Sequence, residues 1–350
     1  MLLSINQSIE NILRRAENDN EIIIQLKQII SEQESSARKL KESKTISELF
    51  FENNQIIQSN SKSLFIKTGF NALDNAIGGF MLGEYIVIGG RPGMGTTQFL
   101  VNLSLYISPT IPILYFTFDQ NEFVLTKRFI STLSDIEIQK NIANELSEDE
   151  RTLINAVGRT LDKFNILIND DYNYSLQDFR LLCQNHIETH GVQIIILDEL
   201  QLMSPAHRYR NSRELEINSI SRELKSIAKD FNVCVIAASQ LSRAVEYRTG
   251  YEGKRPQLSD LRESGALEQD ADKVIFIHRP EYYHITENLL GNDTKNIVEL
   301  IVAKNKIGAV DNVEIKRNSH FTTFGNIEFE YEDQFSFYKN RLSEIDEMPF

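Results

Sequence analysis

The chain has 350 residues, of which 41% are hydrophobic and 25% charged, a composition typical of a globular protein rather than a disordered or fibrous one. At roughly 150 residues per domain, this length fits two domains or one large domain with an appendage. The formal net charge is −13, from 37 basic and 50 acidic residues. The field of the whole molecule therefore does not attract nucleic acid, and any contact with DNA requires a local basic patch.

The sequence predicts neither membrane insertion nor export. No stretch approaches the roughly 18 consecutive apolar residues that span a bilayer, and polar residues interrupt the N-terminal MLLSINQSIENILRR every few positions. The two cysteines, Cys183 and Cys234, lie within apolar runs, where a buried neutral thiol is expected rather than a disulfide or a metal ligand. The sequence predicts a cytoplasmic protein.

Residues 1–66 form a helical N-terminal region. They contain no glycine or proline, and apolar residues recur at helical spacing over 5–12 and 23–30, which predicts two or three helices. The polar segment 31–45 is an exposed helix or a linker, and SNSKS at 59–63 marks the next boundary. At the other end, residues 326–350 carry seven acidic residues against Lys339 and Arg341 and are predicted to be a flexible acidic tail.

From Thr68 onward, short β-branched runs alternate with longer amphipathic segments. The runs are YIVIGG (85–90), PILYFTF (112–118), VQIIILD (192–198), NVCVIAAS (232–239), KVIFIH (273–278) and IVELIVAK (297–304). This alternation predicts an α/β fold with a parallel sheet and crossover helices. One crossover is a clear core-facing helix, because its apolar residues step by three and four. These are Ile217, Ile220, Leu224, Ile227 and Phe231.

A glycine-rich turn joins the run YIVIGG to an apolar helix pattern. Its residues are Gly90, Arg91, Pro92, Gly93, Met94, Gly95, Thr96 and Thr97. Such a turn between strand and helix presents backbone N–H groups to phosphate oxygens. Against the template G-x-x-x-x-G-K-[ST], Gly90, Gly95 and Thr97 match, whereas Thr96 stands at the lysine position. Without further support from the sequence, the segment could equally be a plain tight turn.

Two strands supply that support at their C-terminal ends. The run VQIIILDELQLM ends at Asp198 and Glu199, the layout of a strand that delivers a carboxylate to Mg²⁺. The alternative is an ordinary strand terminus. The run NVCVIAASQ ends at Ser239 and Gln240, where the Gln240 amide either senses a γ-phosphate or caps the strand.

Three segments resemble the replicative DnaB-type helicases. They are TGFNALDNAIGGFMLGEYIVIGGRPGMG (68–95), the stretch from ILDELQLM to SQLSRAVEYR (196–248) and KRPQLSDLRESGALEQDADKVIFIHRPEYY (254–283). The resemblance covers about residues 67–325 and implies a RecA-like motor domain that hydrolyses ATP with Mg²⁺. It also implies assembly into hexameric rings around single-stranded DNA during replication.

The resemblance carries roles onto matching positions only. It implies Thr97 as the Mg²⁺-ligating hydroxyl, Asp198 as the Mg²⁺-associated carboxylate and Gln240 as the γ-phosphate sensor. It places one further set, within SDLRESG, on the loop that faces DNA, although this loop alternatively packs subunits together. The set is Arg262, Glu263 and Gly265.

Three departures from the family pattern predict weakened hydrolysis. Thr96 replaces the lysine that faces developing negative charge. Asp119 stands where the family has the glutamate that polarises the attacking water, and its shorter side chain makes the geometry of a general base doubtful. The trans-acting basic pair is Lys304 and Lys306, with Lys306 in place of the arginine finger, which keeps the charge but loses the planar fork.

Other residues of the sequence are candidates to compensate for these departures. Glu199 could act as the base if its strand ends at Asp198, because neighbouring residues on a regular strand point to opposite sides. Arg91 or Lys127 could replace the missing lysine.

Further expectations concern assembly and DNA. The N-terminal region is too short for the family's full collar domain. A linker helix that docks on a neighbouring subunit nevertheless fits residues 31–58. Ile46, Leu49 and Phe50 either form the docking face of this helix or pack on their own domain. The loop after Pro205 carries three arginines that are candidates for contacting DNA. They are Arg208, Arg210 and Arg213.

The sequence thus predicts a DnaB-type helicase motor with weakened ATP hydrolysis, and partners that include single-stranded DNA, a homo-hexamer or another helicase ring, and primase or loader proteins. The alternative is a non-catalytic DnaB-like subunit that modulates, loads or joins a replicative ring. A third reading is a protein that binds single-stranded DNA without a motor cycle.

Overall fold

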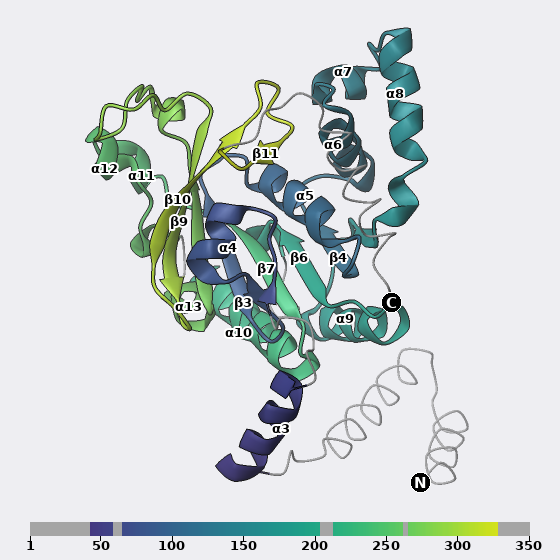
Figure 1. The fold of residues 1–350 in the computed structure, drawn as a ribbon, viewed down its shortest axis with the longest axis vertical. Helices are drawn as coiled ribbons and strands as arrows, with labels where there is room; N and C mark the ends of the chain where they lie inside the picture. The colour runs from purple at the N-terminus through teal and green to yellow at the C-terminus, as the bar shows by residue number, and fades with distance from the viewer. Residues whose placement is uncertain (1–42, 59–64, 204–212, 262–264, 328–350) are drawn as a thin grey trace, which may run out of the picture. The chain divides into compact units, whose positions relative to one another are not determined.

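The computed structural model describes residues 43–58, 65–203, 213–261 and 265–327 (Figure 1). The chain divides into two compact units, Met1–Lys62 and Ser63–Phe350. In the first unit the described element is helix α3 (Ile46–Gln58), which agrees with the helical character predicted for this region. The patterns over 5–12 and 23–30 and the tail beyond Ile327 lie outside the described residues.

The second unit is built on a sheet of nine described strands, in the order β11-β10-β9-β8-β3-β7-β6-β4-β5. The strands are β3 (Tyr85–Gly90), β4 (Ile113–Thr117), β5 (Ile166–Asn169), β6 (Ile194–Asp198), β7 (Cys234–Gln240), β8 (Lys273–His278), β9 (Ile297–Asn305), β10 (Asp311–Arg317) and β11 (Phe324–Gly325). A separate small sheet pairs β1 (Phe65–Ile66) antiparallel with β2 (Phe80–Met81).

The strands from β5 to β8 in this order run parallel, which confirms the predicted α/β architecture. The expectation that the run IVELIVAK joins the parallel set is wrong, because β9 pairs antiparallel with β8 and β10 pairs antiparallel with β9. Parallel strands are usually joined by a crossover helix. The described chain between β8 and β9 forms only a short 3-10 turn, η4 (Pro280–Tyr283), so it returns antiparallel.

Helices cover both faces of the sheet. The α-helices are α4 (Asn71–Ile77), α5 (Thr96–Ile107), α6 (Glu122–Ser134), α7 (Ile138–Ala143), α8 (Glu148–Gly158), α9 (Leu176–His190), α10 (Arg213–Phe231), α11 (Ala244–Tyr247), α12 (Gly250–Lys254) and α13 (Gly265–Asp270). Short 3-10 turns are η1 (Leu161–Lys163), η2 (Leu200–Leu202) and η3 (Leu258–Asp260). Buried residues of α4, α5, α6 and α8 share one core cluster, and those of α9, α10 and α13 share the other.

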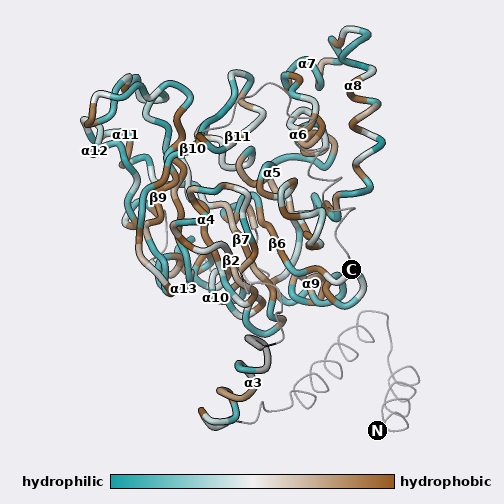
Figure 2. The backbone as a smooth tube through the Cα atoms, viewed as in Figure 1, coloured by the Kyte–Doolittle hydropathy of each residue, from teal (hydrophilic) through white to brown (hydrophobic). Residues whose placement is uncertain are grey.

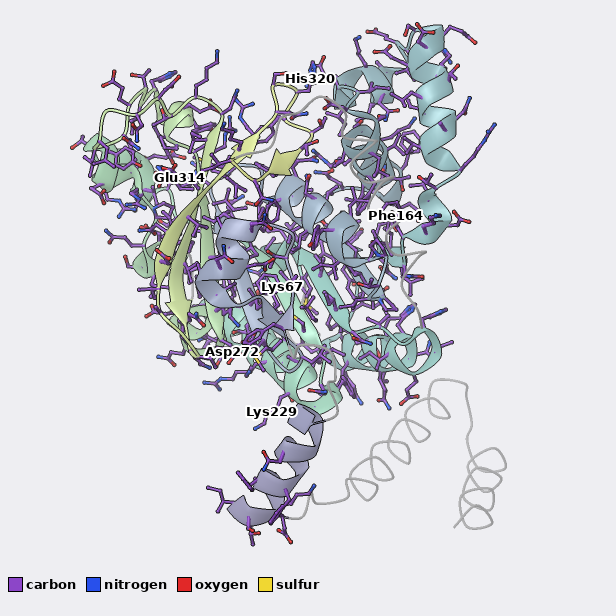
Figure 3. The ribbon with its side chains drawn as sticks, viewed as in Figure 1. Lys67, Phe164, Lys229, Asp272, Glu314 and His320 are labelled. Atoms are coloured by element: carbon purple, nitrogen blue, oxygen red, sulfur yellow. The ribbon has the colours of Figure 1, made fainter. Side chains whose placement is uncertain are left out.

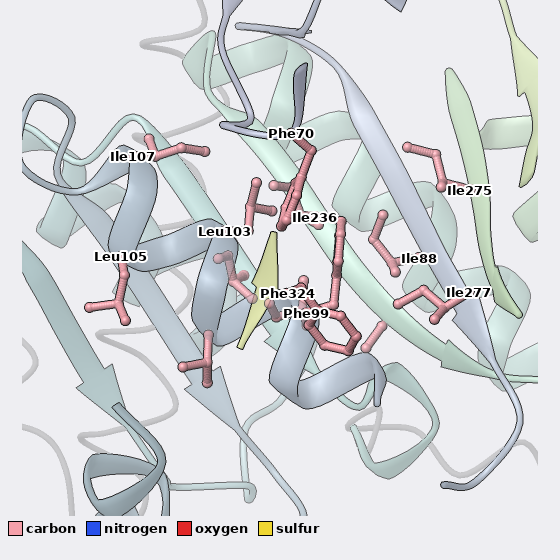
Figure 4. Close-up of a cluster of buried hydrophobic side chains, with 14 of the residues drawn as sticks. Phe70, Ile88, Phe99, Leu103, Leu105, Ile107, Ile236, Ile275, Ile277 and Phe324 are labelled. Carbon is pink, nitrogen blue, oxygen red and sulfur yellow. The ribbon is translucent and has the colours of Figure 1, made fainter. Parts of the chain in front are cut away.

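Successive side chains of the central strands belong alternately to the two core clusters. On β3, Ile86 and Ile88 belong to the first cluster, whereas Tyr85 and Val87 belong to the second, as the period of two along a strand requires. In the first cluster Phe99 of α5 stacks on Phe70 with ring centroids 4.9 Å apart, and both lie beside the strands (Figure 4). Hydrophobic residues accordingly concentrate along the central strands (Figure 2).

Helix α10 matches the predicted crossover. Ile217, Ile220, Leu224 and Ile227 are buried and Phe231 is partly buried. Cys183 and Cys234 are buried free thiols, as predicted. Among the helices of the described ranges, none combines the length and apolar character that crossing a bilayer demands.

Candidate nucleotide-binding site

The loop between β3 and α5 is a tight turn closed by its own backbone. The N–H of Met94 donates to the carbonyl of Arg91 at 3.1 Å, and the N–H of Phe99 donates to the carbonyl of Gly95 at 2.8 Å. Gly95 has φ 95°, and a Cβ built on it would lie 2.7 Å from the ring of Phe321, so this position requires glycine. Because the first N–H groups of a helix lack intrahelical partners, the start of α5 is suited to bind an anion.

A pocket of about 560 Å³ opens beside this loop. It brings together the loop and the carboxyl ends of β4, β6 and β7, where ligands bind in open α/β sheets. The loop residues in its wall are Gly90, Arg91, Pro92, Gly93, Gly95, Thr96 and Thr97. The strand-end residues are Asp119, Asp198, Glu199, Ser239 and Gln240. Met94 is the exception among the predicted loop residues, since its side chain is buried in the core.

Asp198 ends β6 and is buried in the pocket wall. The hydroxyl of Tyr115 on β4 donates to its Oδ2 at 3.0 Å, and the Thr97 hydroxyl also bonds its carboxylate. Burial raises the pKa of Asp198 above its usual value, and these hydrogen bonds oppose the rise. Thr97 and Asp198, which lie far apart in the sequence, therefore present their oxygens to the same point of the pocket.

Glu199 follows directly after the end of β6, so the condition set for it is met and its side chain lines the same pocket as Asp198. Burial, followed by the negative charges of Asp198 and Asp119, raises the pKa of Glu199 to about 7. Asp119 lies in the exposed bend after β4 and lines the same pocket. Three carboxylates therefore share one cavity.

Gln240 ends β7 and is held by Gln201, a residue of η2 that the motifs did not single out. The backbone N–H of Gln240 donates to Oε1 of Gln201 at 3.1 Å, and Nε2 of Gln201 donates to the hydroxyl of Ser239 at 2.9 Å. The carbonyl of Gln240 accepts a further bond from Nε2 of Gln201 at 3.2 Å. This amide ties the end of β7 to the turn after β6.

Arg91 and Lys127, the two cations expected to compensate for Thr96, are both engaged elsewhere. Nε of Arg91 donates to Glu246 of α11 at 2.9 Å, its Nη1 donates to the carbonyl of Leu241 at 2.6 Å, and the residue is only 6% exposed. Nζ of Lys127 donates to Oδ1 of Asn141 at 3.1 Å, and Lys127 is not among the residues lining the pocket.

Lys304 and Lys306 lie at the opposite end of the strands from the loop. Gly90 is in register with Ile277 at the far end of β8, whereas Lys304 is in register with Val274 near its start. Nζ of Lys306 pairs with Oδ1 of Asp272 at 3.0 Å, and Nζ of Lys304 donates to the carbonyl of Gln269 at 3.1 Å. Figure 3 shows this separation, with His320 of the pocket and Asp272 at opposite ends of the second unit.

Two of the six DNA-binding candidates are described. Arg213 is the first residue of α10 rather than part of the preceding loop, and it pairs with Glu216 at 2.6 Å. Gly265 begins α13. The other four, Arg208, Arg210, Arg262 and Glu263, lie outside the described residues.

The pocket also contains residues that sequence motifs did not reveal. Among them are Arg128 of α6, Arg279 after β8, and His320 and Phe321 between β10 and β11. The amphipathic pattern of α6 shows where a helix lies but does not mark which polar residue faces a ligand. The β10–β11 segment comes from the antiparallel edge, whose path the sequence did not predict.

Comparison with known proteins agrees with this architecture. The family model described as DnaB-like helicase C terminal domain matches residues 65–326. The replicative DNA helicase DnaB of Rickettsia prowazekii is 35% identical over 308 residues, covering 81% of this chain and 63% of the relative. The replicative DNA helicase DnaC of Bacillus subtilis is 35% identical over 271 residues, covering 77% of this chain and 58% of the relative. The chain thus spans about three fifths of the length of these curated relatives.

Solved structures give the same match. One, described as an ATPase domain, has a TM-score of 0.73 and 32% sequence identity, covering 82% of this chain and 100% of the other. A structure of a DnaB-like replicative helicase and its interactions with primase has a TM-score of 0.70 and 31% identity, covering 93% of this chain and 76% of the other. These matches confirm the predicted RecA-like fold.

Proposed function

The chain belongs to the DnaB-like helicase family, and on that premise we propose that residues 67–325 form an ATP-driven motor acting on single-stranded DNA in replication. The observation that carries the proposal is the pocket in which the β3–α5 loop, Thr97, Asp198 and Gln240 converge. A loop at a helix start and a carboxylate at a strand end are the parts that a nucleoside triphosphate site needs.

In this proposal the backbone N–H groups at the start of α5 bind phosphate oxygens. The Thr97 hydroxyl and the Asp198 carboxylate are hard oxygen ligands, which Mg²⁺ prefers. Within the described residues no cluster of three or more acidic, histidine or cysteine side chains forms a metal site by itself. That fits an ion held by one or two protein oxygens together with the phosphates of the nucleotide. Bound Mg²⁺ would neutralise charge on those phosphates.

Asp119 is the proposed general base, with Glu199 as its rival. Asp119 stands at the family's position for this role, while Glu199 lies in the same pocket. Replacing each by its amide decides between them. We expect Asp119→Asn to abolish turnover and Glu199→Gln to retain most of it, because only the true base must accept a proton. The opposite pattern would assign the base to Glu199.

Lys304 and Lys306 are proposed to act on the nucleotide of a neighbouring subunit in a homo-hexamer. Their position at the end of the strands opposite the pocket supports this, because neither lysine lines the pocket of its own chain. The proposed DNA-facing loop carries Arg262, Glu263 and Gly265, with Arg208 and Arg210 as further contacts. Primase or a loader protein is the proposed partner, since one structural neighbour is described with primase.

The relatives reported above are replicative DNA helicases, so we do not favour the alternative of a non-catalytic ring subunit. Hydrolysis is nevertheless proposed to be weak, because Thr96 leaves the loop without its cation.

Steady-state ATP hydrolysis with and without single-stranded DNA tests the function. We expect slow turnover that DNA stimulates, and a loss of roughly 100-fold or more in Asp198→Asn, which removes charge from the proposed Mg²⁺ ligand. Turnover that persists in Asp198→Asn would indicate a contaminating enzyme. Nucleotide binding without turnover in the unaltered protein would favour the non-catalytic alternative.

A further inference from the structure

The phosphate loop has one cation in the pocket wall, Arg91, and its guanidinium is engaged by other residues of the protein. Thr96 stands at the lysine position, and a Cβ built on Gly90 would collide with its hydroxyl, so the Thr96 side chain packs back against the start of the loop. Arg91 is committed to Glu246 and to the carbonyl of Leu241. A triphosphate bound here requires a positive charge from another element.

Two other arginines line the pocket, Arg128 and Arg279. Arg279 is already used in the protein: Nη1 donates to the carbonyl of Gly93 at 2.8 Å, Nη2 pairs with Glu281 at 2.7 Å, and the guanidinium lies 4.3 Å from the ring centroid of Phe321. These contacts hold the loop and the β10–β11 segment together. Arg279 therefore has a structural role in the pocket wall.

Arg128 has a different set of contacts. It lies on α6, and its Nε donates to Oε1 of Gln120 at 2.8 Å. Within the described residues its two terminal nitrogens make no other hydrogen bond or ion pair. Burial lowers the pKa of Arg128, while Asp198 and Asp119 favour its charged form, and arginine stays protonated in proteins. A partly buried guanidinium with unused donors thus borders the cavity near the two carboxylates.

We propose that Arg128 supplies the positive charge that Thr96 removes from the loop, and that its terminal nitrogens bind the β- and γ-phosphates of a nucleoside triphosphate. This inference rests on the proposed function of the pocket and names the residue that makes binding work without the loop lysine. The planar guanidinium forms two parallel bonds to phosphate oxygens, which a lysine at the same place could not reproduce.

The proposal predicts that positions 96 and 128 are coupled. Equilibrium binding of a fluorescent ATP analogue, with Mg²⁺, is measured for the full chain and for R128Q, T96K and the double variant R128Q/T96K. We expect R128Q to weaken binding roughly 10- to 100-fold, the range of a lost charge-assisted contact. T96K should restore much of that loss in the double variant, because a new cation then faces the same phosphates.

Lys127→Gln is the matched control. It removes one positive charge from the neighbouring position of α6, and Lys127 bonds Asn141 rather than lining the pocket, so affinity should stay unchanged. Arg128→Lys keeps the charge and provides a second measurement should R128Q fail to fold, as judged by its thermal melt. We expect an intermediate affinity for Arg128→Lys because the fork is lost.

The outcomes distinguish failure of the proposed role of Arg128 from failure of the proposed function of the pocket. Equal affinities of the unaltered chain and R128Q overturn the role of Arg128 while the nucleotide site stands. Binding only after T96K also overturns it, because Arg128 alone would then be insufficient. Absence of binding in both the unaltered chain and T96K overturns the proposed function as well.

Discussion

His278 illustrates how one buried residue couples the fold to pH. It ends β8 and is 1% exposed, and neither ring nitrogen has a hydrogen-bond partner among the described residues. Burial, with a smaller contribution from Arg255, lowers the pKa of His278 to about 3. In the unfolded chain its pKa is roughly 6.5. The native state therefore binds fewer protons than the unfolded state between these two values.

Stability should accordingly fall as the pH drops below about 6.5. We expect His278 to account for a loss of about 2 kcal/mol in the free energy of unfolding between pH 7 and pH 5. Urea denaturation at both pH values, for the unaltered protein and His278→Phe, measures this contribution. The variant should lose that part of the pH dependence, whereas His284→Asn, at an exposed histidine, should keep it. An unchanged pH dependence in His278→Phe would contradict the assignment.

Helix α10 packs its apolar side against one face of the sheet. Leu224 is 1% exposed in the second core cluster, while Arg222, two positions earlier, is exposed to solvent. We expect Leu224→Ala to lower the free energy of unfolding by roughly 2–5 kcal/mol, through lost burial and the cavity left behind. Arg222→Ala should change it by less than about 0.5 kcal/mol. Chemical denaturation of both variants checks the contrast, and equal losses would argue against the core role of Leu224.

Helix α3 carries the predicted subunit-docking face. Leu49, Phe50 and Phe51 are exposed on it, Phe50 to 57%, and burying such side chains on a neighbour would favour association. We expect Phe50→Asp to shift the protein from the proposed hexamer to smaller species in light scattering, with its thermal melt unchanged. Lys44→Asp, just before the helix, serves as a charge control. A hexamer that persists in Phe50→Asp would place the docking surface elsewhere.

The helices and strands also show which parts of the fold can be predicted from the sequence. The runs around β3, β4, β6, β7, β8 and β9 are recognisable because their residues are buried on one or both faces, and α10 because its apolar residues repeat at helical spacing. The strand β5 has only four residues, β10 is mostly polar and β11 has two residues, so the sequence pattern does not reveal them. Strand direction depends on the connection, and for β9 the sequence pattern does not distinguish a crossover from a return.

The pocket was predictable where motifs lie at strand ends. Gly90, Thr97, Asp198 and Gln240 meet because carboxyl ends of parallel strands share one edge of the sheet. Arg128 and Gln201 escaped recognition because each is one polar residue on an amphipathic or short element, and its direction depends on tertiary packing. Arg91 was assigned to nucleotide for its place in the loop, yet Glu246, far away in the sequence, binds its guanidinium.

For the whole molecule, the decisive prediction concerns where Lys306 acts. If it completes the site of a neighbour, Asp198→Asn and Lys306→Ala subunits are each inactive alone. Mixing them should restore part of the activity, because a Lys306→Ala pocket can then receive the lysine of an Asp198→Asn neighbour. ATPase assays over a range of mixing ratios measure this. A lysine that acts within its own chain would give no recovery, and mixing Asp198→Asn with Asp119→Asn is the matched negative control.

The pocket and Lys306 lie at opposite ends of the strands of the same sheet. This arrangement determines how many complete nucleotide sites an assembly of subunits can hold. If Lys306 acts on the nucleotide of a neighbour, each subunit offers half of two different sites and completes neither alone. Subunits joined head to tail in an open chain hold one complete site fewer than their number, and only closure supplies the last one. Turnover per subunit would thus rise with the length of the chain and reach its ceiling on closure, so that the rate itself reports whether the ring is shut.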